Sequence, residues 1–141
     1  MNIDSIVNGI VIDHIPTGRG MMLYDLLGLG DLDCSIAIIK NVNSAKMGKK
    51  DIIKIDADIE LNVDIIGYIA PDVTVNIIKK GTIVEKKTIA LPKLLTGVIH
   101  CKNPRCITST EQELDHVFKL VDEKTQSYRC IYCETEAQRK A

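Results

Sequence analysis

The sequence predicts an α+β protein with two domains, and three observations lead to this prediction. Before residue 90, runs rich in isoleucine and valine alternate with short segments that have apolar residues at helical spacing. Around Pro92 and Gly97 the composition changes from isoleucine-rich to polar. Four of the five cysteines follow this change, in two closely spaced pairs. We therefore expect one domain over residues 1–93 and a smaller one over residues 94–141.

The N-terminal pattern begins with a strand and a helix. Residues 10–15, IVIDHI, are mostly β-branched and end at the turn-forming stretch PTGRG. The following segment, MMLYDLLGLG, has apolar residues at helical spacing. Gly28 is a suitable end for this helix, because glycine readily adopts the left-handed conformation found there.

The rest of the N-terminal pattern completes a known order of elements. Residues 34–40 and 51–56 predict two strands separated by a long polar turn. A second helix is expected from an N-cap at Asn62 to a terminator at Pro71, followed by a hairpin around Lys80-Gly81. The order predicts a ferredoxin-like, split βαβ domain with an antiparallel sheet, two helices and one additional strand.

Composition limits the class of protein. With 45% hydrophobic and 26% charged residues, the chain is typical of a folded globular protein. The net charge is -1, and residues 97–141 contain seven Lys or Arg against seven Asp or Glu. A protein that neutralises many phosphates needs a basic excess. The charge therefore argues against nucleic acid as a partner.

The sequence also predicts a cytoplasmic location. Asp4 lies where a signal peptide would be basic, and no apolar run reaches the length of a membrane span. We expect neither secretion nor membrane association. Thiols stay reduced in the cytosol, so closely spaced cysteines there favour a metal site over disulfides.

Four cysteines predict a metal site in the C-terminal domain. Cys101 and Cys106 enclose four residues, Cys130 and Cys133 enclose two, and 23 residues separate the pairs. Two such loops can supply a closed tetrahedral shell of four thiolates, which is typical of structural zinc. We expect a small all-β, rubredoxin-like or zinc-ribbon-like domain with one zinc ion. Iron, disulfides and a redox pair at the second loop remain the alternatives.

Three further residues of metal-ligand type are not expected to bind the metal. His100 adjoins the first cysteine, but four thiolates already complete a shell, so we expect it on the surface or in packing. His116 lies in ELDHVFKLV, an alternating segment, and is expected within a strand. Cys34 is expected to be a free thiol in the core of the other domain.

The N-terminal domain has no recognisable catalytic motif, phosphate loop or paired carboxylates. What stands out is an adjacent carboxylate and imidazole, Asp13 and His14, at the end of a strand, with Lys54 and Lys86 on later strands. In a split βαβ sheet these groups can converge on a polyanion such as a nucleotide. An Asp-His pair of this kind is more often a hydrogen-bonded surface pair, so composition and spacing alone leave both roles open.

Four segments resemble one family in the same order. They are GIVIDHIP, MGKKDIIKI, YIAPDVTVN and the Cys-x4-Cys, x23, Cys-x2-Cys cluster. Together they resemble the regulatory chain of aspartate carbamoyltransferase over nearly the whole chain. The resemblance implies a non-catalytic subunit of the enzyme that makes N-carbamoyl-aspartate from carbamoyl phosphate and aspartate in pyrimidine synthesis.

The resemblance also implies ligands and partners. CTP with UTP would inhibit and ATP would activate, in competition for one site in the N-terminal domain. The zinc domain would contact the catalytic chain. Regulatory dimers, paired through their N-terminal domains, would bridge catalytic chains in a dodecamer of two catalytic trimers and three regulatory dimers.

Matching motifs imply specific effector contacts. Asp13 and His14 would face the ribose and phosphates, Lys54 the ribose and base, and Lys86 the triphosphate. The full set implied is Ile6, Val11, Asp13, His14, Lys54, Asn76, Ile78, Ile83 and Lys86. At Gly81 well-known members have an aromatic residue near the base, so this chain lacks that contact. The alternative function is a zinc-ribbon nucleic-acid adaptor, which the neutral charge disfavours.

Overall fold

A computed structural model describes residues 6–137 and confirms the α+β class. The chain divides into two compact units, Met1–Ala90 and Leu91–Ala141. Each unit has its own antiparallel sheet, with five strands in the first and three in the second.

The sheet of the N-terminal unit has the split βαβ order. Its strands are β1 (Gly9–Pro16), β2 (Ile36–Ser44), β3 (Gly48–Ile55), β4 (Thr74–Lys79) and β5 (Thr82–Thr88). They lie in the order β2-β3-β1-β4-β5, and every neighbouring pair is antiparallel. Strands β1 and β2 thus run in the same direction with β3 between them, and β5 is the additional edge strand.

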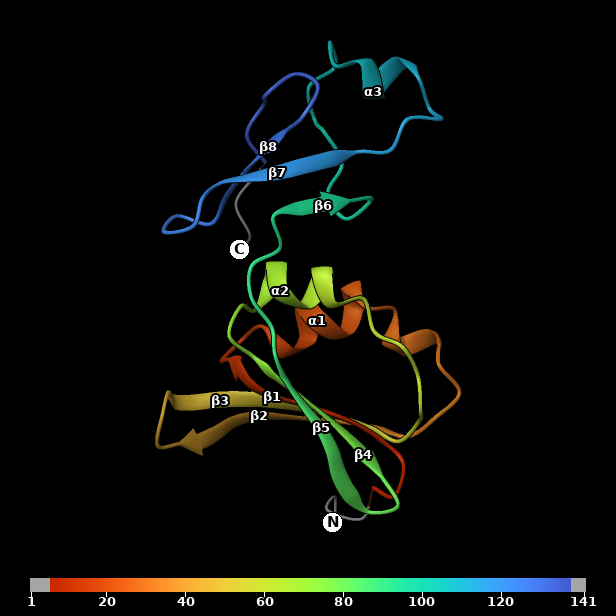
Figure 1. Cartoon of the computed structure of the whole chain (residues 1–141), viewed down its shortest axis with the longest axis vertical. Coiled ribbons are helices and arrows are strands. Elements are labelled where there is room, and N and C mark those ends of the chain that lie inside the picture. The colour runs from red at the N-terminus through yellow and green to blue at the C-terminus, as the bar shows by residue number, and fades with distance from the viewer. Residues whose placement is uncertain (1–5, 138–141) are drawn as a thin grey trace. The chain divides into compact units, whose positions relative to one another are not determined.

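Both helices of this unit, α1 (Gly20–Leu26) and α2 (Val63–Ile69), cover the same face of the sheet (Figure 1). A short 3₁₀ turn, η1 (Leu29–Asp31), follows α1. The strands send alternate isoleucines under the helices, and Ile12, Ile53 and Ile55 are fully buried. The other face of the sheet, called the open face below, carries the intervening side chains.

The predicted helix ends are confirmed. The Asn62 side chain accepts hydrogen bonds from the amides of Asp64 and Ile65, at 3.0 and 3.3 Å, and so caps α2. Gly28, with φ of 67°, follows the C-cap of α1. At the predicted hairpin, Lys80 and Gly81 have φ of 53° and 75°, the left-handed pair that a two-residue turn between twisted strands requires.

The prediction of a long turn over residues 41–50 is wrong. Strands β2 and β3 continue through most of it, and only residues 45–47 form the turn. The polar residues there are compatible with strand because this end of the hairpin is exposed. A register shift between Ile39 and Val42 is accommodated by Asn41, whose φ is 58°.

The C-terminal unit is a small three-stranded sheet with one helical turn. Its elements are β6 (Leu94–Thr96), α3 (Ile107–Thr110), β7 (Val117–Asp122) and β8 (Ser127–Cys130), with strand order β6-β7-β8. Leu95, Phe118 and Tyr128 form its apolar centre. The Tyr128 hydroxyl donates to the carbonyl of Pro92 at 2.7 Å. No helix within residues 6–137 is long and apolar enough to cross a membrane.

Candidate functional sites

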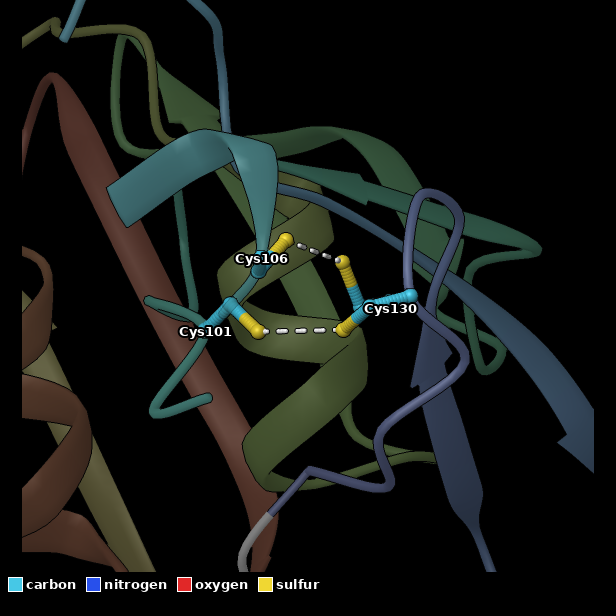
Figure 2. A group of neighbouring side chains, drawn as sticks. Cys101, Cys106 and Cys130 are labelled. Carbon is cyan, nitrogen blue, oxygen red and sulfur yellow. Dashed lines mark hydrogen bonds between the residues drawn. The ribbon is translucent and has the colours of Figure 1, made fainter. Parts of the chain in front are cut away.

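The four C-terminal cysteines meet at one point, as their spacing predicted. Cys106 is the N-cap of α3, Cys130 ends β8, and Cys101 and Cys133 lie in the adjoining loops. Their sulfur atoms all lie within 4.8 Å of one another. Figure 2 shows the sulfurs of the labelled cysteines directed toward this common point.

The distances between sulfurs fit a tetrahedral metal ion. Cys101 Sγ lies 3.6 Å from Cys133 Sγ, and Cys106 Sγ lies 3.7 Å from Cys130 Sγ. A tetrahedron with metal–sulfur bonds of about 2.3 Å has edges of about 3.8 Å. A disulfide has a sulfur–sulfur bond of about 2.05 Å, and all four thiols are free. The arrangement is that of a metal-binding site.

Neighbouring groups shift the pKa values of the four thiols in different directions. The hydroxyls of Thr135 and Thr108 lie 3.1 Å from the sulfurs of Cys133 and Cys106. The side-chain and backbone hydrogen bonds with Thr135 lower the pKa of Cys133 to about 6, and those with Thr108 lower the pKa of Cys106. Burial instead raises the pKa of Cys101 to about 12. Two thiols therefore ionise readily, and a cation is needed for all four to be thiolates.

His116 supports the metal site, a role that the sequence did not reveal. Its Nδ1 accepts a hydrogen bond from the Cys101 amide at 2.9 Å. The residue lies just before β7, so its predicted place within a strand is wrong. His100 packs edge-on against His116, with ring centroids 4.7 Å apart. His116 lies fifteen residues from Cys101 in the sequence, and no sequence pattern connects two residues at this separation, so the hydrogen bond could not be predicted.

Four of the predicted effector residues form one row across the sheet. Lys54 lies opposite Val11, Val11 lies opposite Asn76, and Asn76 lies opposite Lys86. Directly opposite residues of antiparallel strands project from the same face. Since Ile12 and Ile53 of the same strands lie under the helices, this row lies on the open face.

The remaining predicted residues lie next to this row. Asp13 is two residues along β1 from Val11 and shares its face, and Ile78 lies opposite Ile83. His14 follows Asp13 at a register shift in β1, with φ of 62°. Ile6 precedes β1 and lies beside Gly9.

Lys50 is an additional charged residue at this site. Its Nζ lies 2.9 Å from Asp13 Oδ1, which also accepts a hydrogen bond from the His14 amide at 2.6 Å. Burial raises the pKa of Asp13, but these contacts outweigh it and the pKa is lowered overall. Lys50 was overlooked because Lys49 and Lys50 are equivalent in sequence, and only the pairing of β3 with Pro16 selects Lys50.

Two side-chain polar atoms of strands β1 and β4 are buried without a partner. Within the described part of the chain, the buried side-chain atoms that lack a hydrogen bond are His14 Nδ1 and Asn76 Oδ1. Buried polar atoms nearly always have a partner in native proteins. Both belong to the predicted effector residues and are available to a further polar partner.

Comparisons with known proteins identify the family. The model of the aspartate carbamoyltransferase regulatory chain, allosteric domain, matches residues 1–90, and the model of its metal binding domain matches residues 93–141. The chain belongs to this family. It is therefore a regulatory chain with an allosteric and a metal-binding domain, and it is not an enzyme by itself.

Curated relatives agree over almost the full length. Aspartate carbamoyltransferase regulatory chains include that of Clostridium botulinum strain Hall, 48% identical over 95% of this chain and 92% of its own. The regulatory chain of Clostridium tetani is 47% identical over 95% of this chain and 94% of its own. That of Bifidobacterium longum is 41% identical, covering 98% and 99% of the two chains.

Proposed function

We propose that this chain is the allosteric subunit of an aspartate carbamoyltransferase in pyrimidine synthesis, and that the open face binds CTP, UTP and ATP at one site. The observation that supports this most strongly is the pair of unpartnered buried atoms, His14 Nδ1 and Asn76 Oδ1, near Lys50 and Lys86. A nucleotide offers hydrogen-bonding groups to these two atoms and phosphate oxygens to the lysines.

The charges of the open face suggest how a nucleotide lies on it. Lys86 on β5 and Lys50 on β3 would bind phosphate oxygens, because charge-assisted hydrogen bonds are the stronger kind. Asp13, which holds Lys50, would accept from the ribose hydroxyls. Val11, Ile78 and Ile83 would supply the apolar surface for the base, with Lys54 and Ile6 at its border.

The metal is proposed to be zinc, held by Cys101, Cys106, Cys130 and Cys133. A shell of four thiolates leaves no open coordination position, so the ion acts in structure and not in catalysis. It would fix the loops of residues 94–141, through which the chain contacts catalytic chains. Residues 1–93 would pair regulatory chains into dimers that bridge two catalytic trimers in a cytoplasmic dodecamer.

Regulation by this site requires a difference in affinity. A nucleotide shifts the enzyme between two states only if it binds one state more tightly than the other. Coupling free energies of about 1–3 kcal/mol are typical of such systems, enough to change catalytic affinity several-fold. Inhibitor and activator would differ in which state they prefer.

The decisive experiment is a titration of the purified chain with CTP and ATP. We expect saturable binding in which each nucleotide displaces the other. Lys86→Ala should weaken binding about 10- to 100-fold, since it removes a charged hydrogen-bond donor. Lys87→Ala is the matched control, because Lys87 lies opposite Val75 on the helix-covered face. Binding of an oligonucleotide with a steep salt dependence, without mononucleotide binding, would overturn the proposal.

A further inference from the structure

Arg19 makes an unusual contact between two segments of the N-terminal unit. It lies in the loop between β1 and α1, and its Nη1 donates to the carbonyl of Ile69, the last residue of α2, fifty positions away. The last carbonyls of a helix have no partner within the helix, and a cation near them is favourable. The last turn of α2 has no basic residue. Arg19 therefore supplies from another element the cation that α2 lacks.

The loop that bears Arg19 is fixed to strand β3. Asp51 is fully buried, and its Oδ2 accepts from the amides of Gly18 and Gly20 at 3.1 Å each. Asp51 follows Lys50, the partner of Asp13, directly in β3. Asp51 thus ties the backbone on both sides of Arg19 to β3. The residue before Asp51 is Lys50, which faces the proposed nucleotide.

The other end of the contact adjoins the segment that leaves the unit. Three residues after Ile69, the amide of Asp72 donates to the carbonyl of Ile89 at 2.7 Å, and the amide of Ile89 donates to that of Val73 at 3.0 Å. Ile89 is followed by Ala90, the last residue of the N-terminal unit. The residues that follow α2 and the exit segment are therefore held together by backbone hydrogen bonds.

We propose that Arg19 is a positioning residue that couples the nucleotide-bearing face to this exit segment. This inference rests on the proposed function and adds to it the route of regulation. A phosphate bound by Lys50 and His14 alters the balance of charge around Asp13 and the adjoining loop. Arg19 transfers the resulting displacement of the loop to the end of α2 and so to the segment joined to the metal-binding unit. Arg19 itself contacts no nucleotide.

The test uses the complex assembled with catalytic chains and separates binding from response. The variants are Arg19→Ala, Arg19→Lys and, as a control in the same loop, Thr17→Ala, since Thr17 is exposed. For each, the dissociation constants of CTP and ATP are measured by calorimetry, and catalytic activity is measured with and without saturating nucleotide. In Arg19→Ala we expect dissociation constants within threefold of wild type and at least half of the activity change lost. Arg19→Lys, which retains a cationic donor, should recover part of the response, and Thr17→Ala should be normal.

The outcomes distinguish this inference from the proposed function. A wild-type complex that binds no nucleotide would overturn both. If Arg19→Ala keeps the full activity change that nucleotides cause in wild type, the coupling role of Arg19 is overturned and the proposed function stands. The same holds if Arg19→Ala loses the activity change only because it no longer binds nucleotide.

A second measurement on the wild-type complex covers the case in which Arg19→Ala does not fold. Nucleotide binding should slow hydrogen exchange at the amides of Asp72 and Ile89. Unchanged exchange at these amides, with nucleotide bound, would contradict the coupling.

Discussion

The two units of this chain are stabilised by different means. The N-terminal unit packs a continuous layer of isoleucines between a five-stranded sheet and two helices. The C-terminal unit has Leu95, Phe118 and Tyr128 as its fully buried large side chains, beside a cluster of cysteines. A domain of this size rarely builds a sufficient apolar core. We infer that a metal ion held by the four cysteines would stabilise the unit with the smaller apolar core, and that the larger unit needs none.

Metal removal should have the largest effect and should be confined to one unit. Structural zinc contributes about 10–16 kcal/mol in small domains of this kind. Chelation, or Cys130→Ser, should therefore unfold the C-terminal unit while the N-terminal unit keeps its fold. Residue-resolved NMR spectra before and after chelation provide the measurement.

The matched control is Cys34→Ser, which alters the one described cysteine outside the cluster. We expect this variant to retain both its metal content and its spectrum. Loss of the N-terminal fold together with the metal would show that the two units are not independent.

The next largest effect is expected at Asp51 in the N-terminal unit. Its carboxylate accepts from the amides of Gly18, Gly20 and Asn41. Asp51→Ala leaves these amides without an acceptor and should lower the free energy of unfolding by about 3–5 kcal/mol. Thermal or urea unfolding would measure it, with the exposed Asp56→Ala as control. Equal stability of the two variants would show that the buried carboxylate is dispensable.

A smaller effect is expected at His116 in the C-terminal unit. Without its Nδ1, the Cys101 amide loses its acceptor and the first cysteine loop is less well held. His116→Ala should weaken metal affinity about 10- to 100-fold, as is typical for residues that orient ligands. Competition with a chromogenic chelator gives the affinity, and the exposed His100→Ala should change it less. If both variants bind metal like wild type, His116 has no role in the site.

The smallest effect is expected from the Asp13–Lys50 pair. Because the pKa of Asp13 is lowered in the folded state, the pair stabilises the fold above the unfolded pKa of 3.8. This stability is lost as pH falls through the folded pKa. Its size should be about 0.5–1 kcal/mol, as for other partly exposed pairs. Carboxyl titration by NMR should show a pKa below 3.8 that rises in Lys50→Met, and an unchanged pKa would contradict the pairing.

Sequence patterns predicted the elements well where a local signal existed. The Asn62 cap, the stop at Gly28 and the Lys80-Gly81 turn are each determined by neighbouring backbone, and all three were found as expected. The cysteine cluster was equally predictable, because thiolate ligands come in short loops whose spacing is visible. The family resemblance, which the comparisons confirm, supplied the predicted effector residues, which stay a prediction.

Contacts between distant strands were not predictable from local patterns. Which of two adjacent lysines pairs with Asp13 depends on the register of β3 against β1. The bonds of His116 to Cys101 and of Arg19 to Ile69 depend on tertiary packing, with no signal at either residue. The strands through residues 41–50 were missed because exposed hairpin ends have few apolar residues to reveal them.

The central claim is that the N-terminal unit binds nucleotide and the C-terminal unit contacts the catalytic chains. The most direct test is to titrate CTP into the chain before and after metal removal. Assembly of the chain with catalytic trimers is measured on the same two samples. We predict that the dissociation constant for CTP stays within threefold of its original value while assembly with the catalytic trimers is lost. A chain that loses nucleotide binding along with its metal, or that still assembles without the metal, would contradict this account.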